Sequence, residues 1–525
     1  MIKAVGLYTS LLLYAATLAS AAIGPTGELV ISNRELSPDG LSRLAVTAGG
    51  IHPGPLIRAQ KGDRFRINVV NNLTEFSMYK STSVHWHGLH MTRRNFADGA
   101  AWVTQCPISP GNSFLYDFSA PGQAGTFWYH SHLSTQYCDG LRGPLVIYDP
   151  RDPHRSLYDV DDESTIITLS DWYHRPSRGA APHGVLPPIP NSTLINGRGR
   201  YPGGPAVPFS IVNVRQGRRY RFRIIAMACD PYWDFSIDNH NLTIIEADGE
   251  NTVPLQVDSF RIFAGQRYSA ILNANRPVGN YWIRSNPYPR RGHAGFEGGI
   301  NLAILRYAGA SNADPTSVQT PSVQPLREAN LRALTNPRAP GQPVPGGADV
   351  TININSEFDF DTWQFKMNGV PFAAPNVPTL LQILSGVQRA QDLLPTGTVY
   401  ELPPNRVVEL SFPGTAPTQG GPHPFHLHGH SFSVVRSADS PNYNFENPVR
   451  RDTVSTGDVT DNVTIRFVTD NAGPWFLHCH IDFHLDLGMG VVFAEDINGT
   501  SLQNPVSQAW NNLCPEYERL RPDDP

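Results

Sequence analysis

The chain has 525 residues and a formal net charge of −5, and charged residues make up 17% of it. This length exceeds what a single hydrophobic core usually holds, so we expect two to four domains. The mild acidity argues against nucleic acid as a partner. The 45 glycines and 47 prolines are typical of a protein built from many short strands joined by turns.

Residues 1–21 are predicted to be a secretory signal peptide. Lys3 is followed by an apolar run to Leu18 and then by the small residues Ala19-Ser20-Ala21, which resemble a cleavage site. A membrane anchor is not expected, because the apolar run is short and no later segment is long enough to span a bilayer. We therefore expect a secreted, extracellular protein whose mature chain starts near Ala22.

Secretion permits disulfide bonds. The chain has five cysteines, at positions 106, 138, 229, 479 and 514. If Cys479 binds a metal, the other four can form two bridges in any of three connectivities. Five Asn-x-Thr sequons beside a signal peptide also predict a glycosylated protein. They begin at Asn72, Asn191, Asn241, Asn462 and Asn498.

Alternation of apolar and polar residues predicts β-strands along most of the chain. The clearest runs are 64–70, 115–118, 145–148, 165–169, 219–225, 243–246, 268–272, 407–412 and 463–468. Helical periodicity is rare. Its clearest case is 377–394, where Leu380, Leu381 and Leu384 fall on one side. The sequence therefore predicts an all-β protein.

One sequence pattern occurs three times in the chain. Residues 125–132 read Gly-Thr-Phe-Trp-Tyr-His-Ser-His, and residues 473–480 read Gly-Pro-Trp-Phe-Leu-His-Cys-His. The middle copy, 279–286, has Arg284 and Asn286 where the other two have histidine. We interpret the chain as one β unit used three times, with a middle unit that holds no metal.

The repeat sets the expected domain boundaries. They fall near residues 148–161 and in the Pro-rich stretch 308–349, which is predicted to be a surface connector. After the signal peptide we therefore predict three domains, at 22–150, 151–315 and 316–525.

Ten of the eighteen histidines lie in four short clusters, and all four clusters are in the two outer repeats. They are His85, His87, His130, His132, His423, His426, His428, His478, His480 and His484. Strand alternation puts the two histidines of a His-x-His pair on one face, about 7 Å apart. This spacing suits two neighbouring metals better than chelation of one. A polynuclear metal site between the first and third domains follows.

The stretch 473–489 adds a cysteine to this pattern. In a strand, Cys479 would point to one face and its neighbours His478 and His480 to the other, so that one metal takes the thiolate and others the imidazoles. One Cys, two His and a long axial Met form the ligand set of a blue-copper site, and Met489 lies ten residues after the cysteine. Zinc would normally require paired cysteines at close spacing, which this chain lacks. Non-haem iron would require a carboxylate such as Asp482, and this choice would leave the other histidines without a role.

Together these motifs resemble the multicopper oxidases, and specifically the fungal laccases. The resemblance covers the chain after the signal peptide and rests on four histidine motifs, on Gln105-Cys-Pro-Ile and Thr193-Leu-Ile-Asn-Gly, and on residues 375–386. The resemblance implies three consecutive cupredoxin-like domains, each a Greek-key β-barrel or sandwich. It also implies four copper ions: one of type 1, one of type 2 and a type 3 pair.

The resemblance assigns each ligand to a copper. Type 1 copper would be held by His423, Cys479 and His484, with Met489 in the axial position, and type 2 copper by His85 and His426. The type 3 pair would take His87, His130 and His480 on one ion and His132, His428 and His478 on the other. The implied disulfide bonds are Cys106–Cys514 and Cys138–Cys229.

Further roles come from the same resemblance. Asp230 would receive the phenolic proton, His484 would be the entry point for the electron, and Phe296 would form an aromatic wall of the pocket. Asp98 would lie near the type 2 copper, where protons are needed; a turn aspartate before Gly99 is the structural alternative.

One departure concerns the axial position, where fungal laccases mostly carry Phe or Leu and ascorbate oxidases carry Met.

The chain is nevertheless expected to be a secreted laccase that oxidises small phenolic or aromatic compounds with O₂ and takes part in lignin degradation. We expect a monomer, with no membrane or nucleic-acid partner. The alternatives are an ascorbate oxidase, an Fe(II)-oxidising enzyme, and a copper-storage or electron-transfer protein without O₂ reduction. The loop 175–190, rich in Pro and Ala, is expected to line the substrate mouth.

Overall fold

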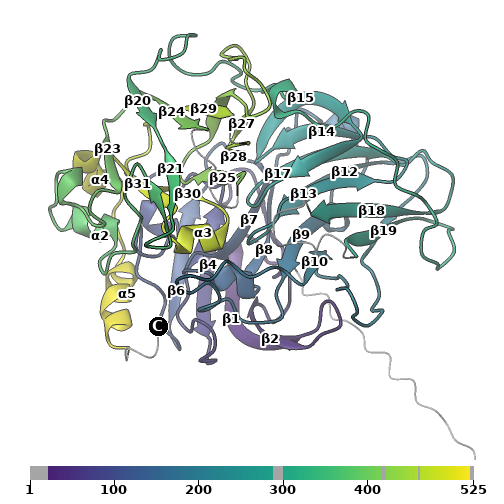
Figure 1. Ribbon diagram of the computed structural model, residues 1–525, viewed down its shortest axis with the longest axis horizontal. Coiled ribbons are helices and arrows are strands. Elements are labelled where there is room, and N and C mark those ends of the chain that lie inside the picture. Colours follow the sequence, from purple (N-terminus) through teal and green to yellow (C-terminus); the bar gives the residue numbers. More distant parts are fainter. Residues whose placement is uncertain (1–21, 288–299, 415–420, 459–460, 521–525) are drawn as a thin grey trace, which may run out of the picture.

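The computed structural model describes residues 22–287, 300–414, 421–458 and 461–520, and strands dominate throughout them (Figure 1). The strands fall into three β units that follow one another along the chain. The short 3-10 helices are Asn95–Ala97, Gln136–Asp139, Arg155–Leu157, Glu163–Thr165, Glu328–Asn330 and Ala390–Asp392.

The first unit has two four-stranded sheets, in the orders β2-β1-β4-β6 and β3-β8-β7-β5. Its strands are β1 (Thr26–Leu36), β2 (Arg43–Ala48), β3 (Ile57–Gln60), β4 (Arg64–Asn72), β5 (Val84–His87), β6 (Ser113–Ser119), β7 (Gly125–Ser131) and β8 (Arg142–Tyr148). β4 and β6 alternate between buried and exposed residues, as the sequence pattern predicts for strands with one face on the core.

The second unit has a six-stranded sheet, β10-β9-β12-β17-β14-β15, and a five-stranded sheet, β11-β19-β18-β13-β16. Its strands are β9 (Ile166–Trp172), β10 (Ser192–Ile195), β11 (Ile211–Val214), β12 (Arg219–Ala226), β13 (Trp233–Ile237), β14 (Leu242–Ala247), β15 (Glu250–Val257), β16 (Ser259–Ile262), β17 (Arg267–Asn273), β18 (Asn280–Pro287) and β19 (Leu302–Tyr307).

The third unit has two five-stranded sheets, β20-β24-β29-β26-β27 and β23-β31-β30-β25-β28, and a separate hairpin of β21 and β22. Its strands are β20 (Val350–Asn353), β21 (Ser356–Asp359), β22 (Gln364–Met367), β23 (Val399–Leu402), β24 (Val407–Pro413), β25 (Pro424–Leu427), β26 (Phe432–Arg436), β27 (Arg450–Arg451), β28 (Thr453–Ser455), β29 (Asn462–Val468), β30 (Gly473–Cys479) and β31 (Gly490–Glu495). The helices are α2 (Thr379–Leu384), α3 (Asp482–Asp486), α4 (Ile497–Gln503) and α5 (Gln508–Glu518).

The three copies of the sequence pattern occupy the same place in their units. They lie on β7, β18 and β30, and each of these strands pairs antiparallel with both of its neighbours. One neighbour (β8, β19 or β31) in turn pairs in parallel with the edge strand of the sheet (β3, β11 or β23). The sequence repeat is thus a repeat of sheet topology, which confirms the predicted all-β architecture of three similar units. The predicted boundaries after residues 150 and 315 fall between β8 and β9 and between β19 and β20.

The helix predicted over 377–394 is shorter in the structure. α2 covers only Thr379–Leu384 and is capped at Ser385, and Gly386 then adopts a φ of +109°, a left-handed backbone that ends the helix. A short 3-10 turn follows at Ala390–Asp392. The sequence pattern did not single out α5, whose buried side chains are Trp510 and Leu513.

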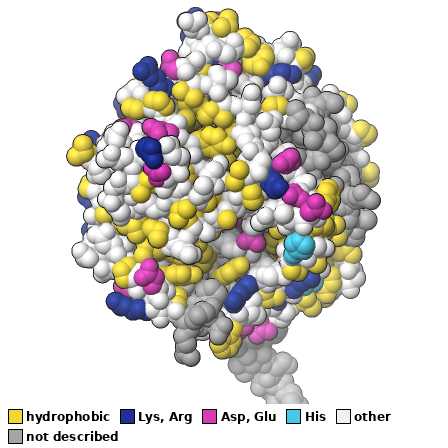
Figure 2. Space-filling view, turned by 60° about the vertical axis from the view of Figure 1, so that its left-hand side comes forward, with side chains coloured by type: hydrophobic (Ala, Val, Ile, Leu, Met, Phe, Trp, Pro, Cys, Tyr) yellow, Lys and Arg dark blue, Asp and Glu magenta, His cyan; other side chains and the backbone are white. Residues whose placement is uncertain are grey.

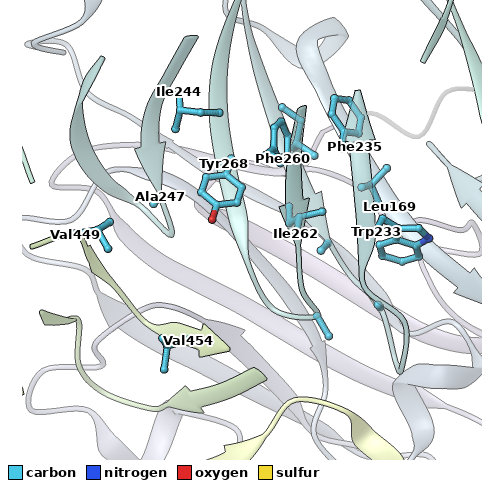
Figure 3. Packing of buried hydrophobic residues seen from close by; sticks show 14 of the residues in the cluster. Leu169, Trp233, Phe235, Ile244, Ala247, Phe260, Ile262, Tyr268, Val449 and Val454 are labelled. Atoms are coloured by element: carbon cyan, nitrogen blue, oxygen red, sulfur yellow. The ribbon is translucent and has the colours of Figure 1, made fainter. Parts of the chain in front are cut away.

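The units share hydrophobic cores. One core cluster runs from the sheets of the second unit into the third, so that Tyr268 and Ala247 lie near Val449 and Val454 (Figure 3). A second cluster joins the first unit to Trp475 of β30. Shared cores fix the units relative to one another, which a site built from two of them requires.

Covalent bonds tie the same units together. Cys106 is bonded to Cys514 of α5, and Cys138 is bonded to Cys229, so the first unit is linked to both others. These are the two pairs that the resemblance implied.

The face in Figure 2 carries scattered charged side chains of both signs among apolar ones. Within the described residues, no helix is long and apolar enough to cross a membrane.

Candidate metal centre

Strand β30 places Cys479 between two groups of histidines. His478 pairs with His426 of β25 and Cys479 pairs with Phe425, and adjacent residues of a strand point to opposite faces. The Cys479 Sγ lies 3.7 Å from Nδ1 of His423 and 3.7 Å from Nδ1 of His484, and these two nitrogens are 3.1 Å apart. The structure thus assembles the Cys-His-His group that the sequence predicted.

Met489 follows this group in the chain and is tied to it through the backbone. Its N–H donates to the His484 carbonyl, and its own carbonyl accepts from the Cys479 N–H, both at 3.0 Å. The side chain is fully buried in the same hydrophobic cluster as Cys479. The residue predicted for the axial position is therefore joined by backbone hydrogen bonds to both Cys479 and His484.

The other eight clustered histidines meet between the first and third units, on β5, β7, β25 and β30 and the residues that follow them. Each of two groups contains three histidines whose ring nitrogens lie within 4.8 Å of one another; the groups are His87, His130 and His480, and His132, His428 and His478. A further group contains His85, His87 and His426. All of these side chains are buried.

The short contacts between imidazoles have the dimensions of ligands around a metal. His132 Nε2 and His428 Nε2 lie 3.3 and 3.1 Å from His478 Nε2, and His480 Nε2 lies 3.1 Å from His87 Nδ1. Two nitrogens that each bind one metal at about 2 Å are separated by such a distance. The donor set therefore fits metal ions at both groups.

Hydrogen bonds to the outer ring nitrogens fix the tautomers in the form that binds metal. The Nδ1 atoms of His85, His130 and His426 lie 2.7, 2.8 and 2.9 Å from the carbonyl oxygens of Asp98, Ser131 and Asp452. Because a carbonyl only accepts, each Nδ1 carries the proton and each Nε2 offers its lone pair. Within the described residues these three Nε2 atoms are buried without a hydrogen-bond partner, as ligand atoms would be.

Burial also keeps the cluster neutral. Burial, followed by the repulsion of neighbouring histidines, holds the pKa values of His130, His428 and His478 well below their usual range. Burial lowers the pKa of His132 to about 3. Neutral imidazole is the form that coordinates metal, so these groups can bind metal well into the acidic range.

Comparison with known proteins agrees with this geometry. Models of the multicopper oxidase family match residues 30–152, 163–310 and 372–499. A laccase of Trametes hirsuta is 59% identical and the match covers 97% of each chain; laccase-2 of Pleurotus ostreatus is 58% identical, over 96% of this chain and 95% of the relative.

The chain is a multicopper oxidase of the fungal laccase group. Solved structures agree: the laccase of Botrytis aclada is 31% identical with a TM-score of 0.81, over 96% of this chain and 94% of that one. Fet3p, a multicopper oxidase that functions in iron import, is 27% identical with a TM-score of 0.81, over 95% of both chains. Copper is therefore the cofactor, and the reaction is one-electron oxidation of a small-molecule substrate coupled to four-electron reduction of O₂ to water.

Asp98 lies beside two histidines of this oxidase. Its Oδ2 is 2.8 Å from Nδ1 of His428, and its Oδ1 is 3.3 Å from Nδ1 of His85. The residue also ends a 3-10 turn, since its N–H donates to the Asn95 carbonyl. Both interpretations of Asp98, as a turn residue and as an acid at the cluster, thus describe its position.

The sequence analysis did not find an aspartate and an arginine that support the histidine cluster of this laccase. The guanidinium of Arg267, on β17 of the second unit, forms two hydrogen bonds to the Asp452 carboxylate, at 2.8 and 2.7 Å. Oδ1 of Asp452 is also 3.1 Å from Nε2 of His87. Both charged side chains are fully buried. The only sequence signal was a polar run at 450–452, which is unremarkable on its own.

Gly265 brings the second unit into contact with the same histidines. A Cβ atom at this position would lie 2.9 Å from Cδ2 of His480 and 3.0 Å from Cε1 of His87. The backbone has a φ of +86°, which glycine adopts readily. The second unit therefore supplies no clustered histidine but closes one side of the cluster.

Asp230 lies in a loop that contacts residues of all three units. Its N–H and that of Cys229 donate to the Asp171 carboxylate, and the Asp482 N–H at the start of α3 donates to the Cys229 carbonyl at 2.9 Å. Because α3 carries His484, the loop of Asp230 is fixed to the element that presents this imidazole. Phe296, expected in the same pocket, lies outside the described residues.

The contact at Gly265 leads to a test with a matched control. Gly265→Ala should lower the copper content of the histidine cluster, because the methyl group pushes His87 and His480 apart, and should leave the blue band at Cys479 intact. Gly217→Ala, at φ +83° with no atom within 4 Å, carries the same backbone cost of roughly 1–2 kcal/mol without the clash. Copper counts per protein and the visible spectrum of both variants measure this. Full copper in Gly265→Ala would contradict it.

Proposed function

We propose that this laccase is a secreted phenol oxidase in which electrons enter at His484 and leave Cys479 for the histidine cluster. The observation that carries the proposal is the position of Cys479. Its Sγ faces His423 and His484, while its two chain neighbours, His478 and His480, face the cluster histidines His132 and His87. The two metal groups are thus joined through one short stretch of backbone.

The proposed ligand assignment follows the groups in the structure. A type 1 copper would be held by His423, Cys479 and His484, with Met489 as axial group. A type 2 copper would be held by His85 and His426, and the type 3 pair by His87, His130, His480 and by His132, His428, His478. Copper in these positions would accept single electrons from the substrate and deliver them to O₂.

The chain's own residues orient the ligands and move protons. Backbone carbonyls fix the tautomers of His85, His130 and His426, and Asp452, held by Arg267, fixes the outer nitrogen of His87. Asp98 is the acid nearest His428, and we assign to it the supply of protons for the water that forms.

The acids near His484 favour an organic substrate over Fe(II). A metal ion as substrate would need ionised carboxylates, and Asp482 and Asp486 are the local candidates. Asp482 is buried and its N–H donates to the Cys229 carbonyl, and the exposed Asp486 accepts a hydrogen bond from Ser134 at 2.5 Å. The buried Asp482 and the hydrogen-bonded Asp486 do not form an open cluster of carboxylates at His484, so we assign phenolic and aromatic compounds as substrates.

The proposal extends to the surroundings of the enzyme. Residues 1–21 direct secretion, and the asparagines of the sequons at 72, 191, 241 and 498 are exposed, as glycan attachment requires. We further propose that the enzyme is a monomer with a role in lignin degradation. Its proposed domains are 22–150, 151–315 and 316–525.

Two substitutions test the ligand assignment. Cys479→Ser should abolish both the blue band and the oxidase activity, because the intense visible absorption needs a copper–thiolate bond. His132→Ala should abolish O₂ reduction and lower the copper content of the cluster, yet keep the blue band. Arg284→Ala, at the equivalent place in the second unit, is the control and should change neither. A blue Cys479→Ser protein would show that the thiolate has been misassigned.

Asp230→Asn tests the phenolic proton acceptor. Oxidation of a phenol releases a proton, so loss of the carboxylate should lower kcat/KM for phenols by about tenfold or more. Ferrocyanide, which has no proton to release, should be oxidised at the native rate. Asp234→Asn, which removes an exposed ion pair with Arg261, is the control and should be silent with both donors. Equal losses for phenol and ferrocyanide would assign Asp230 a structural role.

Met489→Leu tests the axial position. A thioether favours the oxidised copper more than a hydrocarbon does, so the substitution should raise the type 1 potential by tens of millivolts, where about 59 mV is a tenfold change in a one-electron equilibrium. The volume is nearly conserved, so the stability cost should stay below about 1.5 kcal/mol. Redox titration of the blue band measures the shift. An unchanged or lower potential would mean that Met489 only fills space.

A further inference from the structure

A cleft of about 1450 Å³ lies between the second and third units. One wall is formed by alternate residues of β13, which are Asp234, Ser236 and Asp238. The other wall consists of loop residues of the third unit, among them Asp439 and Asp458. Pockets that bind drug-sized molecules have volumes of about 300–1,000 Å³. The cleft is therefore large enough for a chain of several linked rings.

The wall on β13 presents hydrogen-bond acceptors that are fixed in place. Asp234 is held by Arg261, whose Nε lies 2.9 Å from Oδ1, and Asp238 is held by Arg284, whose Nε lies 2.7 Å from Oδ1. Ser236 stands between them in the strand and lines the same cleft. Alternate residues of a strand share one face and lie about 7 Å apart. This row of polar groups suits an extended ligand that carries many hydroxyl groups.

An attachment point for such a ligand lies at the end of the same wall. β13 ends at Ile237, and the turn that follows brings Asn241 to the lining of the cleft, where it is exposed. This asparagine begins an Asn-Leu-Thr sequon. His240 fixes the turn, because its Nδ1 is 2.7 Å from the Asp238 carbonyl oxygen and its Nε2 is 2.7 Å from the Tyr307 hydroxyl. The sequon asparagine therefore has a defined position beside the cleft.

Tyr281 supplies an apolar platform next to this turn. It lies on β18, which pairs with β13 in the same sheet, and its half-buried side chain also lines the cleft (Figure 1). Its hydroxyl donates to the Pro277 carbonyl at 2.8 Å, and its ring centroid is 4.9 Å from that of His240. A tyrosine ring combines a flat apolar face with a polar edge. It can therefore pack against the apolar face of a sugar while the sugar hydroxyls turn to the polar wall.

We propose that the N-linked glycan of Asn241 lies in this cleft and bridges the second and third units, with its first N-acetylglucosamine on Tyr281. Among the described residues that line the cleft, Asn241 is the only sequon asparagine. The Pro-rich connector borders the cleft through Val323, whose side chain is 90% exposed, and a glycan in the cleft would cover it. The inference rests on the proposed glycosylation of the enzyme and adds a structural role for one glycan.

Protection from an endoglycosidase tests where the glycan lies. Endoglycosidase H cuts between the two N-acetylglucosamines at the base of a high-mannose glycan, so it has to reach the attachment point. The native enzyme, produced with high-mannose glycans, is treated, and mass spectrometry follows the peptides of Asn241, Asn72 and Asn498. The glycans of Asn72 and Asn498, which are exposed outside the cleft, should be cut at least about tenfold faster than that of Asn241, since a covered bond is cut only when the structure opens.

Unfolding supplies the control for this comparison. In the unfolded chain all three glycans should be cut at the same rate, because the cleft no longer exists. Equal rates in the native enzyme would overturn the proposal. Native Asn241 peptides without a glycan, beside glycosylated Asn72 or Asn498, would overturn it as well.

Substitutions of Tyr281 test the platform without removing the sequon. Tyr281→Leu should leave Asn241 glycosylated but bring its rate of cleavage close to that of Asn498, because the first sugar loses its aromatic surface. Tyr281→Phe keeps the ring and should protect the glycan as the native residue does. If the Leu and Phe variants are cut at the same rate, the first sugar does not lie on Tyr281 and the proposal is wrong.

Loss of the glycan tests the bridge between the units. Asn241→Gln and Thr243→Ala remove the same sequon through different residues, and each should lower Tm by about 2–4 °C, the shift expected for a modest contact in a domain of this size. Thr243→Ser keeps the sequon and Asn498→Gln removes a glycan outside the cleft, so both controls should melt at the native temperature. A native Tm in Asn241→Gln and Thr243→Ala would refute the bridge.

These measurements separate the bridge from the proposed oxidase function. The blue band and kcat/KM for phenols should stay native in Asn241→Gln, because the residue has no place in the metal centre. Failure of the bridge therefore leaves phenol oxidation standing. If no sequon carries a glycan, glycosylation and the bridge fall together, and phenol oxidation is again unaffected.

Discussion

The alternation of side chains along β30 is the constraint on which the metal centre depends. Because successive residues of a strand face opposite sides, His478 and Cys479 cannot serve the same group. The thiol therefore points into the core of the third unit, toward His423 and His484, and the imidazole points toward the first unit. Every other ligand has to be brought to one of these two faces.

Bringing the first unit to the histidine face requires a rigid interface. Shared hydrophobic cores and two disulfide bonds fix the units, and the buried Arg267–Asp452 pair fixes the histidines locally. A buried ion pair contributes little net stability compared with apolar packing, but loss of one partner is costly because a charge is left unpaired. Here the pair also holds the outer nitrogen of His87, so its geometry serves the ligand.

The second unit has lost or never had the metal ligands, and its structure has been put to other uses. At the place of the cluster histidines, Arg284 pairs with Asp238 within the unit. Elsewhere Gly265 contacts the cluster, the loop of Asp230 contacts α3, and the β9–β10 loop contacts the β21–β22 hairpin. These contacts join the second unit to the histidine cluster and to α3, which carries His484.

The sequence alone determined the three β units and the ten histidines and one cysteine of the metal groups. These features are local: a His-x-His spacing with a period of two, a repeated strand pattern, and a cysteine between two histidines. Only the tertiary structure placed Asp452 and Arg267 beside His87 and Gly265 against His480, and only it showed that α2 ends at Leu384. The partners in these contacts lie up to hundreds of residues apart, and each is a common residue in an ordinary local context. Their roles arise from packing between units, which no short pattern in the sequence records.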